Sequence, residues 1–211
     1  IAGLPNDYRK LITKGLFDYD MVSSGVRILT QIYESYNFDC QHAKHYLNNR
    51  EDILRSLNTS REDAKKMVDK VVNGGHWTND GSKITQLFKE LDRNRDAFCE
   101  WNMNGMTSKY TKIFDSMIAY DKFIKKKHKT LKTENGSYIT RIKDDIQSKI
   151  LLSMVDYIGI DHIGALINDG LLSRKKVDLY KLEQHVKNMT DFTLRLAEKS
   201  MKPDISLLPQ R

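Results

Sequence analysis

Apolar residues recur along most of this chain at the spacing of amphipathic helices. Several of these segments have the usual boundary signals, with Ser or Thr before the first turn and Gly after the last. Helices are predicted after Ser23-Ser24-Gly25, around 45–47, from Thr59-Ser60 to Asn73-Gly74-Gly75, and over about 83–101, 107–127, 139–157 and 176–197.

Two short segments do not follow the helical spacing. The first, Leu16–Asp20, comes after Gly15 and is partly apolar, which favours a strand. In the second, an apolar run at Ile163–Ile167 and the pair Leu171-Leu172 flank Asn168-Asp169-Gly170, which predicts a β-hairpin. The run at 163–167 is expected to be buried and to hold the Asp rigidly. The sequence therefore predicts an α+β, predominantly helical fold with a small antiparallel sheet.

The 211 residues have a formal net charge of +7, which suits a polyanionic partner such as nucleic acid. Cys40 and Cys99 form no C-x-x-C pair, which favours a reducing compartment over a disulfide framework. No apolar run is long enough to cross a membrane and no signal peptide is found, so neither a membrane nor a secreted protein is expected. The chain starts at Ile1, and we expect it to be part of a longer polypeptide.

An aspartate at the end of the first predicted strand is a candidate metal ligand. Asp20 directly precedes a predicted helix, so its carboxylate can point into a cleft. Metal-assisted phosphoryl transfer needs such hard oxygen ligands for Mg²⁺. Taken alone, an Asp before Ser-Ser-Gly fits an ordinary helix cap better. Asp18 is a candidate extra carboxylate.

Two further motifs have related chemistry. Arg61 and Lys65 are four positions apart on a predicted helix, so both cations project to one side and could clamp a triphosphate. Asp169, at the tip of the predicted hairpin, is a second candidate metal ligand. Each motif has a plainer interpretation: a solvated basic face for the helix, and a type I′ turn for Asn168-Asp169-Gly170.

The order of these motifs resembles motifs A, B and C of the family A polymerase group. That group includes DNA polymerase I and the single-subunit phage-type RNA polymerases, and the resemblance covers roughly residues 16–175. The segment Asp20–Arg27 looks like motif A. Within it, Ser24-Gly25 matches the RNA polymerase branch, whereas Arg27 and Leu29 match the DNA polymerase branch.

Motifs B and C are matched with two departures. The motif B spacing is met by Arg61, Lys65 and Gly74, and Ala165–Gly170 looks like motif C. This chain has Asn73 and Asn168 where the family usually has Tyr and His. Few residues precede motif A, where the family has its thumb. The chain looks nearest to the divergent primase-polymerases of virophages and mobile elements.

The resemblance implies a single catalytic module over residues 1–211, made of a polymerase palm with a small antiparallel sheet and of helical fingers. The palm is expected at about 1–45 and 137–211, and the fingers at about 46–136. The implied partners are a nucleic-acid template and primer, NTPs or dNTPs, and a fused or associated superfamily 3 helicase. The expected location is the cytoplasm or a viral replication compartment.

The same resemblance implies roles for individual residues. Asp20 and Asp169, with the backbone carbonyl of Met21, would hold two Mg²⁺ ions, which Mn²⁺ can replace. One ion would activate the 3′-hydroxyl of the growing strand and the other would neutralise the leaving pyrophosphate. Nucleotide binding is expected from Arg61, Lys65, Asn73 and Gly25, and support of the site from Arg27 and Asn168.

The function implied is that of a DNA primase-polymerase. DNA polymerases of the family have a bulky Glu five positions after the motif A Asp, which crowds the ribose 2′-hydroxyl. Gly25 stands there in this chain, so both NTPs and dNTPs are expected to fit. Two alternatives stay open: a strict DNA polymerase, and a non-catalytic nucleic-acid-binding module that serves a replication helicase.

Two other clusters give weaker signals. Cys40, His42 and His45 lie close together in sequence but lack a fourth zinc ligand at suitable spacing, which favours a structural or surface role. The lysines between 122 and 132 fit a grip on template phosphates and a solvated face equally well.

Overall fold

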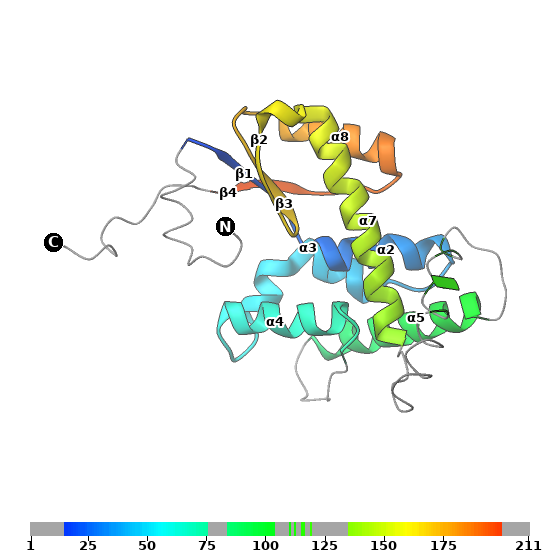
Figure 1. Cartoon of the computed structure of the whole chain (residues 1–211). Coiled ribbons are helices and arrows are strands. Elements are labelled where there is room, and N and C mark those ends of the chain that lie inside the picture. The colour runs from blue at the N-terminus through cyan, green and yellow to red at the C-terminus, as the bar shows by residue number, and fades with distance from the viewer. Residues whose placement is uncertain are drawn as a thin grey trace. The chain divides into compact units, whose positions relative to one another are not determined.

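The computed structural model describes residues 15–75, 84–103 and 135–199, together with 110, 112, 115, 116 and 119 (Figure 1). The chain forms two compact units, of which the first combines residues 1–24 with 147–211 and the second is residues 25–146. In sequence, the second unit is therefore inserted into the first. The first unit has narrower bounds than the palm expected at about 1–45 and 137–211.

The described part of the first unit contains a four-stranded antiparallel sheet with the order β2-β3-β1-β4. Its strands are β1 (Phe17–Met21), β2 (Ile163–Ile167), β3 (Gly170–Ser173) and β4 (Leu196–Lys199). The strand predicted at 16–20 and the hairpin predicted at 163–172 are confirmed. The predicted fold class, α+β and predominantly helical with a small antiparallel sheet, is confirmed as well.

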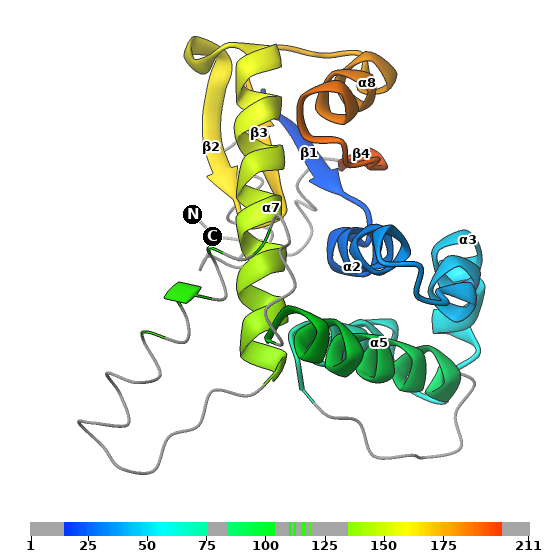
Figure 2. The ribbon, with the colours of Figure 1, turned by 90° about the vertical axis from the view of Figure 1, so that its right-hand side faces the viewer.

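Two helices lie on one side of this sheet. They are α7 (Asn135–Ile158), from Gln147 onward, and α8 (Leu179–Thr190) (Figures 1 and 2). A short 3₁₀ helix, η1 (Ile160–His162), precedes β2. The buried apolar side chains of the unit come from the strands, the two helices and the segment before β4: Tyr19, Met21, Ile150, Met154, Ile158, Leu171, Leu172, Leu182, Val186, Phe192, Leu194 and Leu196.

β2 is less buried than its apolar sequence suggests. The expectation that Ile163–Ile167 is buried is wrong, because its residues alternate between half-buried and exposed, and Leu166 is 55% exposed. The physical reason is that β2 lies at the edge of the sheet formed by the described strands, among which only β3 pairs with it. All residues of β3 are buried. Asp169 is therefore anchored by the strand that follows it.

The helix predicted at 176–197 is too long. α8 begins after its N-cap Asp178 and ends at Thr190. Asp191 follows with a left-handed backbone φ of 64°, a conformation that ends many helices. Residues 196–199 then form β4, which pairs with β1. Apolar spacing alone did not reveal this strand, because its pairing partner lies at the other end of the chain.

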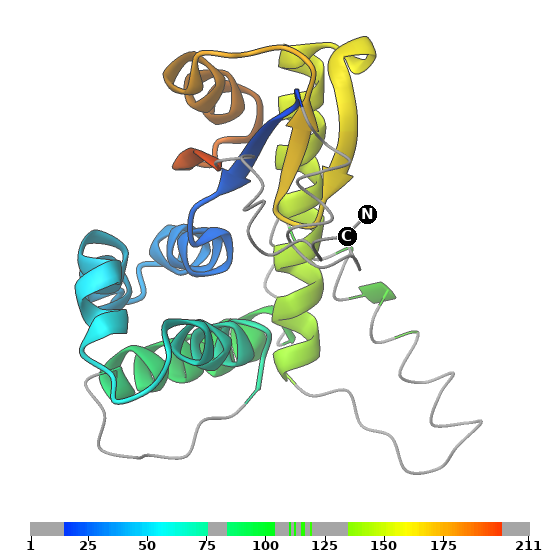
Figure 3. The same cartoon turned by 90° about the vertical axis from the view of Figure 1, so that its left-hand side faces the viewer.

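The second unit is helical in its described part. It contains α2 (Ser24–Ser35), α3 (Gln41–Arg55), α4 (Arg61–Val72), α5 (Thr85–Met103) and the portion of α7 up to Ile146. α5 packs against both α3 and α4 (Figure 3). The helices predicted after 23–25, around 45–47 and at 83–101 are confirmed. The largest buried side chains of the unit include Ile28, Tyr33, Leu54, Phe88, Phe98 and Ile139.

Both predicted ends of α4 are confirmed. Ser60 is the N-cap, and its Oγ accepts a hydrogen bond from the backbone N–H of Asp63 at 3.1 Å. Asn73 is the C-cap. Gly74 follows with a φ of 80°, and a Cβ atom there would lie 2.2 Å from the Cα atom of Gly136. These two glycines therefore allow the chain after α4 to approach the first turn of α7 closely.

Some predicted features lie outside the described residues. They are most of the helix at about 107–127, the lysines between 122 and 132, and all but the first residue of the loop at 75–82. Within the part of the chain that the structure describes, no helix is both long enough and apolar enough to cross a membrane.

Candidate active site

The two candidate metal ligands come together in the first unit. Asp20 lies on β1 opposite Gly170 of β3, the residue that directly follows Asp169. The backbone N–H of Met21 donates a hydrogen bond to the carbonyl oxygen of Asp169 at 2.8 Å. Two carboxylates that are far apart in sequence are thus brought together, Asp20 on β1 and Asp169 in the turn that leads into the neighbouring β3.

Gly170 makes this approach possible. A Cβ atom on Gly170 would lie 2.2 Å from the carbonyl oxygen of Tyr19, closer than real atoms approach. The interpretation of Asn168-Asp169-Gly170 as a type I′ turn is wrong, since neither Asn168 nor Asp169 has the positive φ that this turn requires. The glycine is explained instead by the close packing of β3 on β1, which also sets Asp169 beside Asp20.

The surroundings of Asp20 act on its charge in both directions. Burial is the main cause that raises the pKa of Asp20, and the negative charges of Asp169 and Asp18 raise this pKa further. An ion pair with Lys199 opposes them, with Nζ of the lysine 2.8 Å from Oδ2 of Asp20. The net pKa lies above the ordinary carboxyl value, so the charged form of Asp20 is disfavoured on balance.

Lys199 is a residue of this site that local sequence patterns did not reveal. Its Cα atom pairs with that of Asp18 across β4 and β1, and its side chain reaches diagonally to Asp20. With four residues, β4 is too short for apolar alternation to predict a strand. The helical spacing of the preceding segment also continues into the first residues of β4. Asp18 is buried and shares a face of β1 with Asp20, because alternate residues of a strand point to the same side.

The carboxylates suit Mg²⁺ bound together with a substrate. Among the described residues, no group of three or more His, Cys, Asp or Glu side chains could hold a metal ion. Mg²⁺ sites in enzymes of phosphate chemistry usually contain only one or two carboxylates, with substrate phosphates and water as the other ligands. Asp20 and Asp169 form such a pair, and a cation, the ammonium of Lys199, already binds Asp20. The residues present therefore fit the expected ion.

Two other predicted residues lie next to this pair. Met21 is the last residue of β1 and its side chain is buried, so its backbone carbonyl is the group left to bind a metal ion. Asn168 is exposed at the hairpin turn, and its carbonyl oxygen accepts a hydrogen bond from Nε2 of Gln147. Their roles as ligand and as support stay predictions.

The candidate triphosphate clamp lies in the second unit. Arg61 is the first residue of α4, and Lys65 follows one turn later. Both carboxylate oxygens of Glu51, on α3, accept hydrogen bonds from Arg61, at 2.9 Å from Nε and 2.9 Å from Nη2. This pairing is the main cause that lowers the pKa of Glu51. The fork of Arg61, predicted to hold phosphate, is thus engaged by a carboxylate of the protein.

Lys65 differs from Arg61 in having no such partner. It is half-buried and makes no hydrogen bond or ion pair with any residue that the structure describes. The adjacent Lys66, in contrast, pairs with Asp63 at 3.1 Å. Of the two predicted clamp residues, Lys65 is therefore the one whose charge is available to an external anion.

Asn73 and Gly25 both lie beside Lys143 of α7. This lysine is 7% exposed, and its Nζ donates a hydrogen bond to Oδ1 of Asn73 and pairs with Oδ1 of Asp144 at 3.2 Å. A Cβ atom on Gly25 would lie 3.7 Å from Cδ of Lys143 and only 2.3 Å from Cγ1 of Val72. Gly25 is therefore required for the packing of α2 on α4, whatever else it does.

Sequence reasoning did not single out Lys143. The available signal was its position on the apolar stripe of α7, next to Ile142 and one turn from Ile139 and Ile146, all three buried. A lysine on such a stripe needs a polar partner when it is buried. Arg27, predicted to support the site, is half-buried in the first turn of α2.

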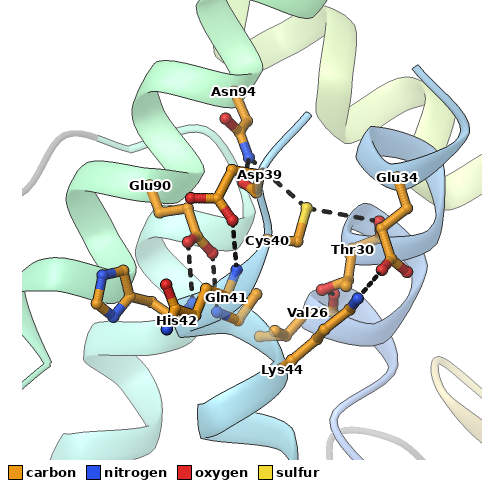
Figure 4. Close-up of polar contacts among 11 residues, drawn as sticks. Val26, Thr30, Glu34, Asp39, Cys40, Gln41, His42, Lys44, Glu90 and Asn94 are labelled. Carbon is orange, nitrogen blue, oxygen red and sulfur yellow. Dashed lines mark hydrogen bonds and ion pairs between the residues drawn. The ribbon is translucent and has the colours of Figure 1, made fainter. Parts of the chain in front are cut away.

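The segment around Cys40 has a structural role (Figure 4). The Cys40 thiol donates to the carbonyl oxygen of Thr30 at 3.8 Å, and its Sγ accepts from Nδ2 of Asn94 at 3.7 Å. The backbone N–H of His42 donates to the buried carboxylate of Glu90 at 2.9 Å. Burial, followed by the charge of Glu90, raises the pKa of Cys40 to about 12. These contacts hold the start of α3 between α2 and α5.

The carboxylates and Lys199 belong to the first unit, and the candidate nucleotide-binding residues belong to the second. The resemblance to family A polymerases was expected from the order of the motifs alone and stays a prediction. No protein-family model, no curated protein and no solved structure matches this chain.

Proposed function

We propose that this chain is the catalytic module of a template-directed nucleotidyltransferase, a DNA primase-polymerase that makes or extends a primer. The observation that supports this best is the position of Asp20 on β1 next to Asp169, in the turn that leads into the neighbouring strand β3 of a small antiparallel sheet. Two-metal nucleotidyl transfer needs carboxylates that share one pair of ions. The partners would be template, primer, NTPs or dNTPs and a superfamily 3 helicase, in the cytoplasm or a viral replication compartment.

In this proposal each residue has a defined task. Asp20 and Asp169, with the Met21 carbonyl, hold Mg²⁺, which when bound stabilises the charge that develops on the 3′-hydroxyl and on the triphosphate. The partial burial of Asp20 strengthens its electrostatic interactions. Lys65 supplies a cation to the triphosphate, and Arg61 joins it only after leaving Glu51.

The choice of sugar would depend on Gly25 and Asn73. Gly25 has no side chain that could crowd a ribose 2′-hydroxyl. Oδ1 of Asn73 accepts from Lys143, so its NH₂ group is left to donate to a ligand. One such hydrogen bond contributes roughly 0.5–1.5 kcal/mol, which is at most about a tenfold preference. Both NTPs and dNTPs should therefore be incorporated.

Two alternatives predict different behaviour. A strict DNA polymerase would reject NTPs strongly. A non-catalytic nucleic-acid-binding module is favoured by one observation, the engagement of Arg61 by Glu51, which removes one cation from the clamp. Such a module would bind template without adding nucleotides, and its binding would not depend on Asp20.

Primer synthesis and primer extension on a single-stranded template, with NTPs and dNTPs supplied separately, test the proposal. Asp20→Asn and Asp169→Asn should each abolish nucleotide addition and leave the circular dichroism spectrum unchanged. Asp161→Asn, which removes the charge of an exposed carboxylate in the same unit, is the matched control and should keep full activity. Near-normal activity of either site variant would contradict the assignment, and no addition by the unmodified chain would favour the binding module.

A further inference from the structure

A lysine binds the carboxylate that the proposed function assigns to a metal ion. Nζ of Lys199 lies 2.8 Å from Oδ2 of Asp20. The contact crosses diagonally between β4 and β1, within the reach of a long side chain on the same face of the sheet. Only 18% of the Asp20 side chain is exposed, compared with 55% of that of Lys199. The ammonium can therefore withdraw into solvent, whereas the carboxylate is held in place.

The charges around Asp20 explain why a cation is needed there. Asp20 is largely buried, the buried Asp18 shares its face of β1, and Asp169 directly precedes Gly170, the residue opposite Asp20. Carboxylates in such positions repel one another, and the ammonium of Lys199 pairs with Asp20 among them. An ammonium in this position offsets repulsion between carboxylates in the same way as a bound metal ion would.

We propose that Lys199 is the resident counter-ion of the Asp20–Asp169 pair and competes with the divalent metal ion for Asp20. Without metal, its ammonium neutralises and orients the Asp20 carboxylate. When Mg²⁺ binds, the ammonium leaves Oδ2 and returns to solvent. Lys199 is thus a positioning residue that sets the metal concentration at which the site fills. The inference rests on the proposed function, because it takes Asp20 as a metal ligand.

A lysine on an edge strand also has an ordinary use. Among the strands that the structure describes, β4 lies at one edge of the sheet, and charged side chains at edges hinder the pairing of strands between molecules. That use needs no carboxylate partner, so it predicts more aggregation on removal of Lys199 but no change in metal affinity. The two roles can therefore be separated by a binding measurement.

A Mn²⁺ titration of the full chain, without nucleotide or nucleic acid, tests the inference. The electron paramagnetic resonance signal of the free ion measures how much Mn²⁺ is bound. Lys199→Met should bind Mn²⁺ about fivefold more tightly, because it removes a positive charge a few ångströms from the ion in partly solvated surroundings. Lys199→Arg, which keeps a cation, should stay within about twofold of the unmodified chain. Lys181→Met makes the same charge change at an exposed position of α8 and should leave the affinity unchanged.

Thermal unfolding gives a second measurement. Without metal, Lys199→Met should unfold at a lower temperature than the unmodified chain, and added Mn²⁺ should raise its Tm by a larger amount. Unchanged or weaker Mn²⁺ binding by Lys199→Met would overturn the inference, with or without aggregation. If Asp20→Asn and Asp169→Asn bind Mn²⁺ as tightly as the unmodified chain, the proposed metal site itself is misplaced. If neither the unmodified chain nor Lys199→Met binds millimolar Mn²⁺, both proposals are wrong.

Discussion

Gly170 lies so close to the carbonyl oxygen of Tyr19 that a Cβ atom on the glycine would be 2.2 Å from that oxygen. The contact belongs to the register that places Gly170 opposite Asp20 and hence Asp169 beside β1. The position of the candidate carboxylates therefore depends on a residue with no side chain of its own.

Gly170→Ala should push β3 away from β1, because a backbone oxygen cannot rotate aside. We expect a loss of about 1–3 kcal/mol in the free energy of unfolding, the usual cost of overpacking, and weaker Mn²⁺ binding. Urea unfolding and a Mn²⁺ titration measure the two effects. Gly164→Ala on β2 is the control, since its Cβ would meet Cδ1 of Leu16, a side-chain atom, at 2.8 Å. Equal stability of the two variants would contradict this account.

The raised pKa of Asp20, caused chiefly by burial and also by the charge of Asp169, makes stability depend on pH. The folded state holds this proton more tightly than the unfolded state. Between the ordinary carboxyl pKa and the higher folded value, stability should therefore fall as the pH rises, and the loss remains at neutral pH. A carboxylate whose pKa is lowered by an ion pair has the opposite effect, because the stability that it contributes increases as the pH rises.

Asp169→Asn should lower the pKa of Asp20, because it removes a negative charge that raises this pKa. The fall in stability with rising pH should shrink accordingly. A carbon-detected NMR titration of the carboxyl groups and urea unfolding across the acidic range measure both quantities. Asp161→Asn should change neither. An unmoved Asp20 pKa in Asp169→Asn would contradict the electrostatic repulsion between the two carboxylates.

Gly25 packs against Val72 with no room for a methyl group, since a Cβ atom would lie 2.3 Å from Cγ1 of the valine. Valine in a helix has one strongly preferred rotamer and cannot easily turn away. Gly25→Ala should therefore destabilise the chain by about 1–3 kcal/mol, even though Ala is the better helix former. Urea unfolding checks this, and Val72→Ala should be less damaging in the Gly25→Ala background than alone. A Gly25→Glu variant made to exclude NTPs is best tested in the Val72→Ala background, which removes the side-chain atom that a Cβ at position 25 would meet.

Lys65 and Arg61 should respond differently to mutation if they serve a triphosphate. Lys65→Ala should raise the nucleotide KM about tenfold, the usual scale of one lost charge-assisted hydrogen bond, with little change in template affinity. Glu51→Gln should lower KM, because it weakens the hold on Arg61. Lys66→Ala, which breaks the pair with Asp63, is the control. Loss of template binding with an unchanged KM would place Lys65 on the template side.

The two cysteines should be unreactive in the folded chain. Burial, with smaller contributions from nearby carboxylates, raises the pKa of Cys40 and of Cys99 to about 12. The thiolate is the nucleophile, and at neutral pH almost none is present at such a pKa. A thiol-reactive disulfide reagent should label neither cysteine until urea unfolds the chain, and then both. Rapid labelling of the folded chain would show that one of them is accessible.

Local patterns in the sequence predicted the elements with strong boundaries. Ser60 and Gly74 bound α4, because a side-chain cap and a left-handed glycine act on backbone groups within one turn. The strand at Asp20 and the hairpin at Asp169 were also predicted. The proximity of Asp20 and Asp169 was expected only from the order of the motifs, because the residues around one aspartate carry no information about the position of the other.

Other features were decided by tertiary contacts. The strand that carries Lys199 exists because it pairs with β1, and its own four residues do not distinguish it from the end of a helix. β2 is half-exposed because it lies at the edge of the sheet that the described strands form, although its sequence is as apolar as that of a buried strand.

The same holds for the charged side chains. Arg61 was predicted to hold phosphate, but the fold places Glu51 beside it. Lys143 was not singled out in the sequence, and the fold brings it within hydrogen-bonding distance of Asn73. Caps, turns and periodicity act over a few residues and can be read from the chain. The partner of a charge and the neighbour of a strand are set by contacts between residues that are distant in sequence, so only the tertiary structure decides them.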